Sequence, residues 1–103
     1  MADLLGTGMT IPREAVVSIG GYWQPKYSVP NAAMVEAVQM LARTEAIPLD
    51  PVYTGKIMAG LIGLARQGYF RPDEDVLFLH TGGLPSLHSY EPVVLGRKPP
   101  AFD

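Results

Sequence analysis

The sequence predicts an α/β fold of three layers, in which helices flank a partial and mostly parallel sheet. Apolar residues at helical spacing alternate with short apolar or β-branched runs, in the order strand, helix, short strand, helix, strand. The last run, residues 76–80, is almost continuously apolar, which is typical of a parallel strand buried on both faces. Parallel strands alternating with helices are joined by right-handed crossovers.

Length and composition favour one globular domain spanning residues 1–103. The chain has 48% hydrophobic and 17% charged residues, which excludes global disorder. A formal net charge of −2 gives no electrostatic basis for a nucleic-acid or anionic-membrane partner, and the absence of cysteine excludes disulfides and thiolate metal sites. No apolar run approaches the roughly 20 residues of a membrane span, and no signal-peptide pattern is present. We therefore expect a cytoplasmic protein.

The first strand is predicted at residues 15–19 and the first helix from Asn31 to about Ala46. Asn31 can cap the start of the helix. Pro48 disfavours helical geometry at the residue before it, Ile47, so the helix should end near Ala46. The apolar face of this helix consists of Met34, Val38, Leu41 and Ala42. Residues 47–50 form at most a very short strand.

A second helix is predicted at residues 55–67, with Thr54 as its cap and Gly68 as its stop. Its buried stripe is predicted to be Met58, Leu61, Ile62 and Ala65. Gly60 and Gly63 inside the helix each cost about 1 kcal/mol relative to alanine, so we expect a neighbouring strand to approach closely there. Lys56, in the first turn, is expected to be solvated and not a nucleophile.

The chain after the last strand is predicted to end in an extended, proline-rich tail at residues 93–103. His80 and His88 lie eight residues apart without a nearby carboxylate cluster, so we expect no metal site.

Ligands of open α/β sheets bind beyond the carboxyl ends of the strands, and several polar and aromatic residues of this chain follow predicted strands. They are Trp23 and Tyr27, then Tyr53 and Thr54, then Thr81, Gly82 and Gly83. If the strands are parallel neighbours, these groups converge on one pocket. Hydroxyls, tyrosine rings and glycines suit a flat, weakly polar aromatic ligand.

Three motifs of the chain match one protein family. They are Asp50-Pro51-Val52-Tyr53-Thr54-Gly55-Lys56, then Ala59-Gly60-Leu61, then Leu79-His80-Thr81-Gly82-Gly83, and Tyr27-Ser28-Val29-Pro30-Asn31 extends the match upstream. They resemble the C-terminal part of the pyridoxal-phosphate-dependent D-cysteine desulfhydrase and 1-aminocyclopropane-1-carboxylate deaminase family, which has the tryptophan synthase β-like fold. The resemblance covers roughly residues 15–90.

The resemblance implies a role for each of five residues. Tyr53 would lie against the pyridine ring and join proton transfer, and Tyr27 would be the second catalytic tyrosine. Thr81 would hydrogen-bond the pyridine nitrogen, with Gly82 lining that end of the ring. Thr54 stands where the deaminase branch has a glutamate, which favours elimination from a small amino acid over ring opening. The implied enzyme class is a lyase or, for the deaminase branch, a hydrolase.

The alternatives to these roles are ordinary structural ones. In the alternative interpretation, the two tyrosines are loop aromatics that pack on the core, and Thr54 only caps a helix. Thr81 and Gly82 then form an ordinary turn at the end of a strand.

The resemblance also implies that the lysine that binds the cofactor covalently, and the loop that holds its phosphate, lie on a segment outside this sequence. Lys56 does not match that lysine. We therefore expect the complete enzyme to carry pyridoxal phosphate and this chain alone to bind none and to be inactive. An unpaired sheet edge further predicts a homo-oligomer, or association with the N-terminal part. A non-catalytic binding or oligomerising module, and an inert remnant that still folds, remain alternatives.

Overall fold

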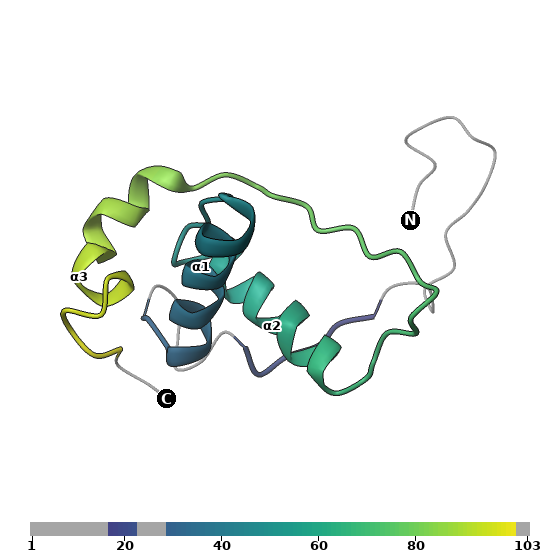
Figure 1. Ribbon diagram of the computed structural model, residues 1–103. Coiled ribbons are helices and arrows are strands. Elements are labelled where there is room, and N and C mark those ends of the chain that lie inside the picture. Colours follow the sequence, from purple (N-terminus) through teal and green to yellow (C-terminus); the bar gives the residue numbers. More distant parts are fainter. Residues whose placement is uncertain (1–16, 23–28, 101–103) are drawn as a thin grey trace, which may run out of the picture.

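The structure, a computed structural model, describes residues 17–22 and 29–100. Its elements are α1 (Ala32–Glu45), α2 (Thr54–Arg66), the 3-10 helix η2 (Leu84–Tyr90) and the short α3 (Glu91–Val94). In Figure 1, α1 and α2 pack against each other, and a long extended run leads from the end of α2 past both helices to η2. The fold is therefore a helical pair bordered by extended chain.

Helix α1 begins as the sequence predicts. The side chain of Asn31 accepts a hydrogen bond of 2.8 Å from the backbone N–H of Met34, which satisfies one of the free amides of the first turn. Met34, Ala37 and Val38 are buried on its inner face. The helix ends at Ala46, whose left-handed backbone (φ 55°) is rare for a residue with a side chain.

Helix α2 begins at Thr54, one residue before the predicted start, and Gly68 follows its end at a φ of 74°. Its first turn lies against α1, since a Cβ on Gly55 would be 2.9 Å from Cγ2 of Val38 and 2.7 Å from the carbonyl oxygen of Asp50. Met58 and Ala59 complete the core with Leu49 and the inner face of α1. Of the predicted buried stripe, Leu61 and Ile62 are partly buried, whereas Ala65 is exposed.

The predicted extended tail is wrong over residues 93–98, which form the end of a short helix and the turns that follow it. Val93 and Val94 are the last residues of α3, and Val93 is buried. The side-chain amide of Gln39 in α1 donates a hydrogen bond of 2.6 Å to the carbonyl oxygen of Val94, and this bond links the end of α3 to α1.

The predicted parallel sheet is not confirmed. Across residues 17–22 and 29–100 the structure has no strand, only an isolated bridge at Asn31. Residues 76–80 are extended, but Leu77 is 93% and Leu79 is 74% exposed, and only Phe78 packs against the core. A strand needs hydrogen-bonded neighbours, which the described residues do not give this segment. Residues 17–19 and 47–50, also predicted as strand, lack neighbours for the same reason.

Candidate cofactor-facing site

The corner where α2 begins is organised by the carboxylate of Asp50. Its Oδ2 accepts backbone N–H groups from Val52 (2.8 Å) and Tyr53 (2.7 Å), and its Oδ1 accepts the N–H of Thr54 (2.9 Å). Asp50 is fully buried. The free amides and the dipole at the start of a helix both favour a negative charge in this position.

The charge state of Asp50 follows from these contacts. Burial by itself would raise the pKa of Asp50, but the hydrogen bonds from the Thr54 hydroxyl and from the three backbone amides outweigh it and hold the pKa below its ordinary value. Asp50 is therefore an ionised carboxylate inside the fold.

Thr54 belongs to the same network. Its hydroxyl donates a hydrogen bond of 2.6 Å to Oδ1 of Asp50 and accepts one of 2.8 Å from the backbone N–H of Asp50. The side chain is fully buried. The structure thus gives Thr54 a role in fixing the helix start, and its predicted contact with a cofactor stays a prediction.

Tyr53 stands just ahead of α2 with its backbone held by Asp50 and its side chain about half exposed. It is suitably placed to meet a ligand from outside the corner. Tyr27, the second tyrosine predicted as catalytic, lies outside the described residues.

The Thr81-Gly82-Gly83 turn lies against this corner. A Cβ on Gly83 would be 2.8 Å from Cγ of Asp50, so only glycine allows the turn to approach so closely. Gly82 N–H donates to Nδ1 of His80 at 3.1 Å, which leaves Nε2 of that ring to donate to the carbonyl oxygen of Pro48 at 2.8 Å. The two predicted loops therefore do lie together, with Asp50 and His80 joining them.

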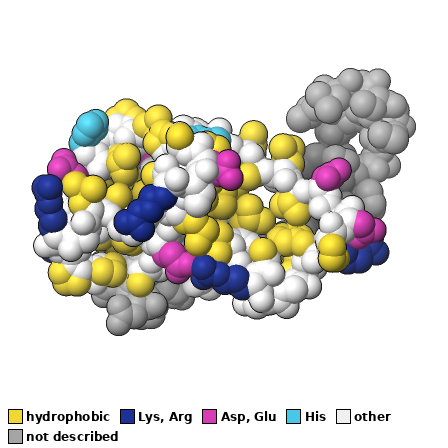
Figure 2. Space-filling model, in the orientation of Figure 1, with side chains coloured by type: hydrophobic (Ala, Val, Ile, Leu, Met, Phe, Trp, Pro, Cys, Tyr) yellow, Lys and Arg dark blue, Asp and Glu magenta, His cyan; other side chains and the backbone are white. Residues whose placement is uncertain are grey.

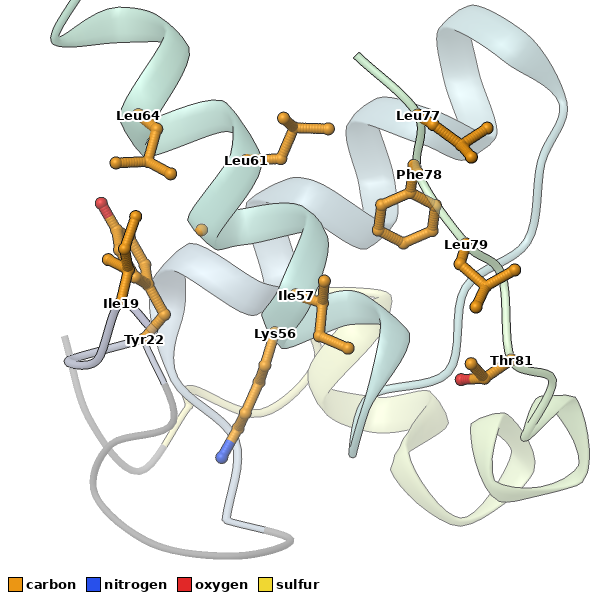
Figure 3. Close-up of a pocket in the computed structure, with 11 residues that line it drawn as sticks. Ile19, Tyr22, Lys56, Ile57, Leu61, Leu64, Leu77, Phe78, Leu79 and Thr81 are labelled. Atoms are coloured by element: carbon orange, nitrogen blue, oxygen red, sulfur yellow. The ribbon is translucent and has the colours of Figure 1, made fainter. Parts of the chain in front are cut away.

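A cavity of about 530 Å³ opens beside the corner. It lies between α2, the segment Leu77–Thr81 and the short stretch that contains Ile19 and Tyr22 (Figure 3). Its walls are mainly apolar, and they include Ile57, Leu61, Leu64, Leu77, Phe78 and Leu79. Of the four predicted site residues that the structure describes, Thr81 lines this cavity, whereas Tyr53, Thr54 and Gly82 do not.

Lys56 is another wall residue, and the expectation that it is solvated is wrong. It is 6% exposed and it also lines the cavity, and its burial lowers the pKa of its amine. Figure 3 shows the amine directed away from Thr81. Lys56 is thus a wall residue of the cavity, with its amine turned from the predicted ring-binding end.

Tyr22 explains the two glycines inside α2. A Cβ on Gly63 would be 2.9 Å from Cε1 of Tyr22 and nearer still to its hydroxyl, and one on Gly60 would be 3.4 Å from the same ring. The sequence predicted a strand in this place, and the structure has an aromatic side chain there.

Sequence reasoning missed Asp50, Lys56 and Tyr22 as site residues. A signal existed only for Asp50, which precedes the helix by four residues, the spacing at which a carboxylate can accept the free amides of a first turn. No group of three or more metal-binding side chains occurs within the ranges that the structure covers. No helix in those same ranges is long and apolar enough to cross a membrane.

The cavity and the turn fit one end of a pyridoxal-phosphate cofactor. The volume exceeds that of a single aromatic ring, the walls are apolar, and the Thr81 hydroxyl supplies one polar group at the edge, a donor set suited to a ring nitrogen. The described residues therefore fit the pyridine ring of the cofactor, and the comparison does not extend to its phosphate.

Comparison with known proteins identifies the family. Residues 1–82 match the pyridoxal-phosphate-dependent enzyme family, and this chain belongs to it. The complete enzymes of the family use pyridoxal phosphate. Similar proteins include the D-cysteine desulfhydrase of Salmonella typhi, which is 55% identical over 73 residues, covering 71% of this chain and 22% of that protein. The D-cysteine desulfhydrase of Yersinia pestis (strain Pestoides F) is 46% identical over 87 residues, covering 84% of this chain and 26% of that protein.

These relatives bear on two predictions. The resemblance to the desulfhydrase family is confirmed, whereas the hydrolase class is wrong, because a desulfhydrase is a lyase. The chain spans only about a quarter of the length of these relatives.

Proposed function

We propose that this chain is the C-terminal portion of a D-cysteine desulfhydrase-like enzyme that acts on a small amino acid by elimination. The observation that carries the proposal is the family match over residues 1–82, a range that contains all five predicted site residues. The contact between the 50–54 corner and the 81–83 turn supports it, since one site needs both. Turnover would require the rest of the family fold.

In this proposal pyridoxal phosphate, when bound, supplies an electron-withdrawing ring that makes the α-hydrogen of the substrate acidic. Thr81 would orient the ring through a hydrogen bond from its hydroxyl to the ring nitrogen, and Gly82 would leave room for the ring edge. The Tyr53 phenol would stand at the ring face and hold a proton for the leaving group, with Tyr27 as the second such group. The hydroxyl proton of Thr54 is held by Asp50, so Thr54 would offer the ring nitrogen no acid.

A chimera tests this proposal directly. The chain replaces the matching segment of the Salmonella typhi D-cysteine desulfhydrase, and sulfide release from D-cysteine is measured. We expect the chimera to be active and Tyr53→Phe to lower kcat at least tenfold. Tyr69→Phe is the matched control, because Tyr69 is similarly exposed at 53% and lies after the end of α2. A folded chimera that binds the cofactor but releases no sulfide contradicts the proposal.

A second candidate is a non-catalytic module that self-associates. It is favoured by one observation, the exposure of Leu77 and Leu79 on an extended segment. In this case sedimentation would show an oligomer of the chain alone, and the chimera would be inactive.

A further inference from the structure

Thr81 is followed by two residues that restrain the backbone very little. Gly82 and Gly83 both have positive φ, 98° and 88°, and glycine has the widest choice of backbone conformation of any residue. Within the part of the chain that the structure describes, residues 75–82 make no backbone–backbone hydrogen bond. The direction of the Thr81 side chain therefore depends on contacts that its neighbours make through side chains.

The ring of His80 makes those contacts. The backbone N–H of Gly82 donates to its Nδ1 at 3.1 Å, and its Nε2 donates to the carbonyl oxygen of Pro48 at 2.8 Å. Pro48 lies two residues before the buried carboxylate of Asp50. One ring thus joins the residues on both sides of Thr81 to the corner where α2 begins.

The two hydrogen bonds of His80 are not a consequence of burial. Both histidines of the chain are exposed (cyan in Figure 2), and an exposed imidazole can bond to water instead. A neutral imidazole has one donor nitrogen and one acceptor nitrogen, so this pair of bonds requires the tautomer with its proton on Nε2. His88 is exposed in the same way but lies in η2, which makes it a matched control.

We propose that His80 is a positioning residue for the reaction, which holds the Thr81 hydroxyl toward the pyridine nitrogen of the cofactor. The inference rests on the proposed function. Thr81 lines the cavity beside Leu79, as Figure 3 shows, whereas His80 is not part of its wall. His80 therefore acts on the cofactor through its neighbour and does not touch it.

The hydrogen bond from Thr81 depends on where the turn holds that residue. A hydrogen bond weakens steeply once its angle falls below about 120°. Without the His80 ring, the two glycines would let the turn adopt conformations in which the hydroxyl no longer points at the ring nitrogen. Loss of His80 should therefore weaken cofactor binding and lower kcat. It should have little effect on the KM of a substrate that Thr81 does not touch.

Nitrogen-15 NMR of the chain alone tests the geometry without any cofactor. We expect the proton of the neutral His80 ring on Nε2, and the amide of Gly82 should exchange with solvent at least fivefold faster in His80→Ala. A proton on Nδ1, or an exchange rate that His80→Ala leaves unchanged, overturns the proposal.

Cofactor binding by the chimera with the Salmonella typhi desulfhydrase tests the role in the site. His80→Ala should raise the Kd of pyridoxal phosphate at least fivefold, and His88→Ala should leave it unchanged. His80→Asn keeps an acceptor for the Gly82 N–H, as in an Asx turn, and His80→Gln keeps a donor for Pro48. Each should lie between the parent and His80→Ala. If both are as weak as His80→Ala, the two hydrogen bonds are not the cause and the proposal is wrong.

A double-mutant cycle shows whether His80 acts through Thr81. In the Thr81→Val chimera the hydroxyl is absent, so adding His80→Ala should change the Kd by less than twofold. The same fivefold change in both backgrounds overturns the proposal, as does a His80→Ala chimera that binds the cofactor like the parent. A parent chimera that binds the cofactor but releases no sulfide contradicts the proposed function instead, and the cycle still decides the role of His80.

Discussion

The corner at Asp50 and the segment at residues 76–80 are opposites in how their polar backbone is satisfied. At the corner, a single buried carboxylate accepts three amides and a hydroxyl, and all of its partners lie within four residues along the chain. Along the segment, Leu77 is 93% exposed and the backbone offers its groups to no neighbour within the described ranges. Backbone groups whose hydrogen-bond partners lie nearby in the sequence can be satisfied within a short segment. An extended segment needs hydrogen-bond partners on neighbouring strands that are distant in the sequence.

The largest expected effect comes from breaking the closed corner. Asp50→Ala removes the acceptor of three amides and of the Thr54 hydroxyl, all in a buried place, and should lower the free energy of unfolding by about 3 kcal/mol. Asp50→Asn keeps the shape and one acceptor, so it should lose less. Urea unfolding followed by circular dichroism measures both. An Asp50→Ala variant as stable as the parent would show that the corner is not held by this carboxylate.

The same contrast explains which parts of the fold could be predicted from the sequence. Asn31 as a cap and Gly68 as a stop are local signals, and both helices lie within one residue of the predicted bounds. The strands could not be confirmed in the same way, because residues 76–80 need partners from elsewhere. Burial of a side chain depends on tertiary packing too. The position of Lys56 in the first turn of a helix therefore gave no sign that this lysine would be buried.

The site was predictable to a similar extent. The motifs at Tyr53-Thr54 and Thr81-Gly82 predicted which loops meet, and the loops do meet. Nothing in their spacing said that Thr54 would turn inward to Asp50, or that Tyr22 would cover Gly60 and Gly63. Those contacts depend on distances in space.

A pair of glycine substitutions sharpens the comparison at the contact between the two loops. Gly82 and Gly83 both have positive φ, 98° and 88°, but only at Gly83 would a Cβ collide with Asp50. Gly82→Ala should cost about 1 kcal/mol for the backbone alone. Gly83→Ala should cost about 1 kcal/mol more, because the corner must also shift. Equal losses in urea unfolding would mean that the turn does not rest on Asp50.

Lowering the pH should reduce the stability of the corner at Asp50 and leave residues 76–80 unchanged. The pKa of Asp50 is lower in the folded chain than its ordinary value of 3.8, so the folded state binds fewer protons and this stabilisation is present above that value. It is lost as the pH falls below about 4. The effect should be smaller than that of Asp50→Ala, because the protonated acid keeps an acceptor oxygen. Urea midpoints between pH 6 and pH 3 should fall in the parent and fall less in Asp50→Asn.

The smallest effect is expected on the open segment, and it is the most informative about what that segment is for. Leu77→Asp changes a side chain with almost no contacts, so the free energy of unfolding of the chain alone should change by less than about 0.5 kcal/mol. Leu49→Ala is the internal comparison, since Leu49, in the connection between α1 and α2, is fully buried in their shared core and the substitution should cost about 3 kcal/mol. Residues 76–80 have the sequence pattern of a buried strand. If Leu77 adds nothing to the free energy of unfolding of the chain alone, this pattern indicates that the segment is stabilised by contacts with residues outside this chain. If Leu77→Asp instead destabilised the chain as much as Leu49→Ala, the segment would already be covered, and the difference between the two regions would not exist.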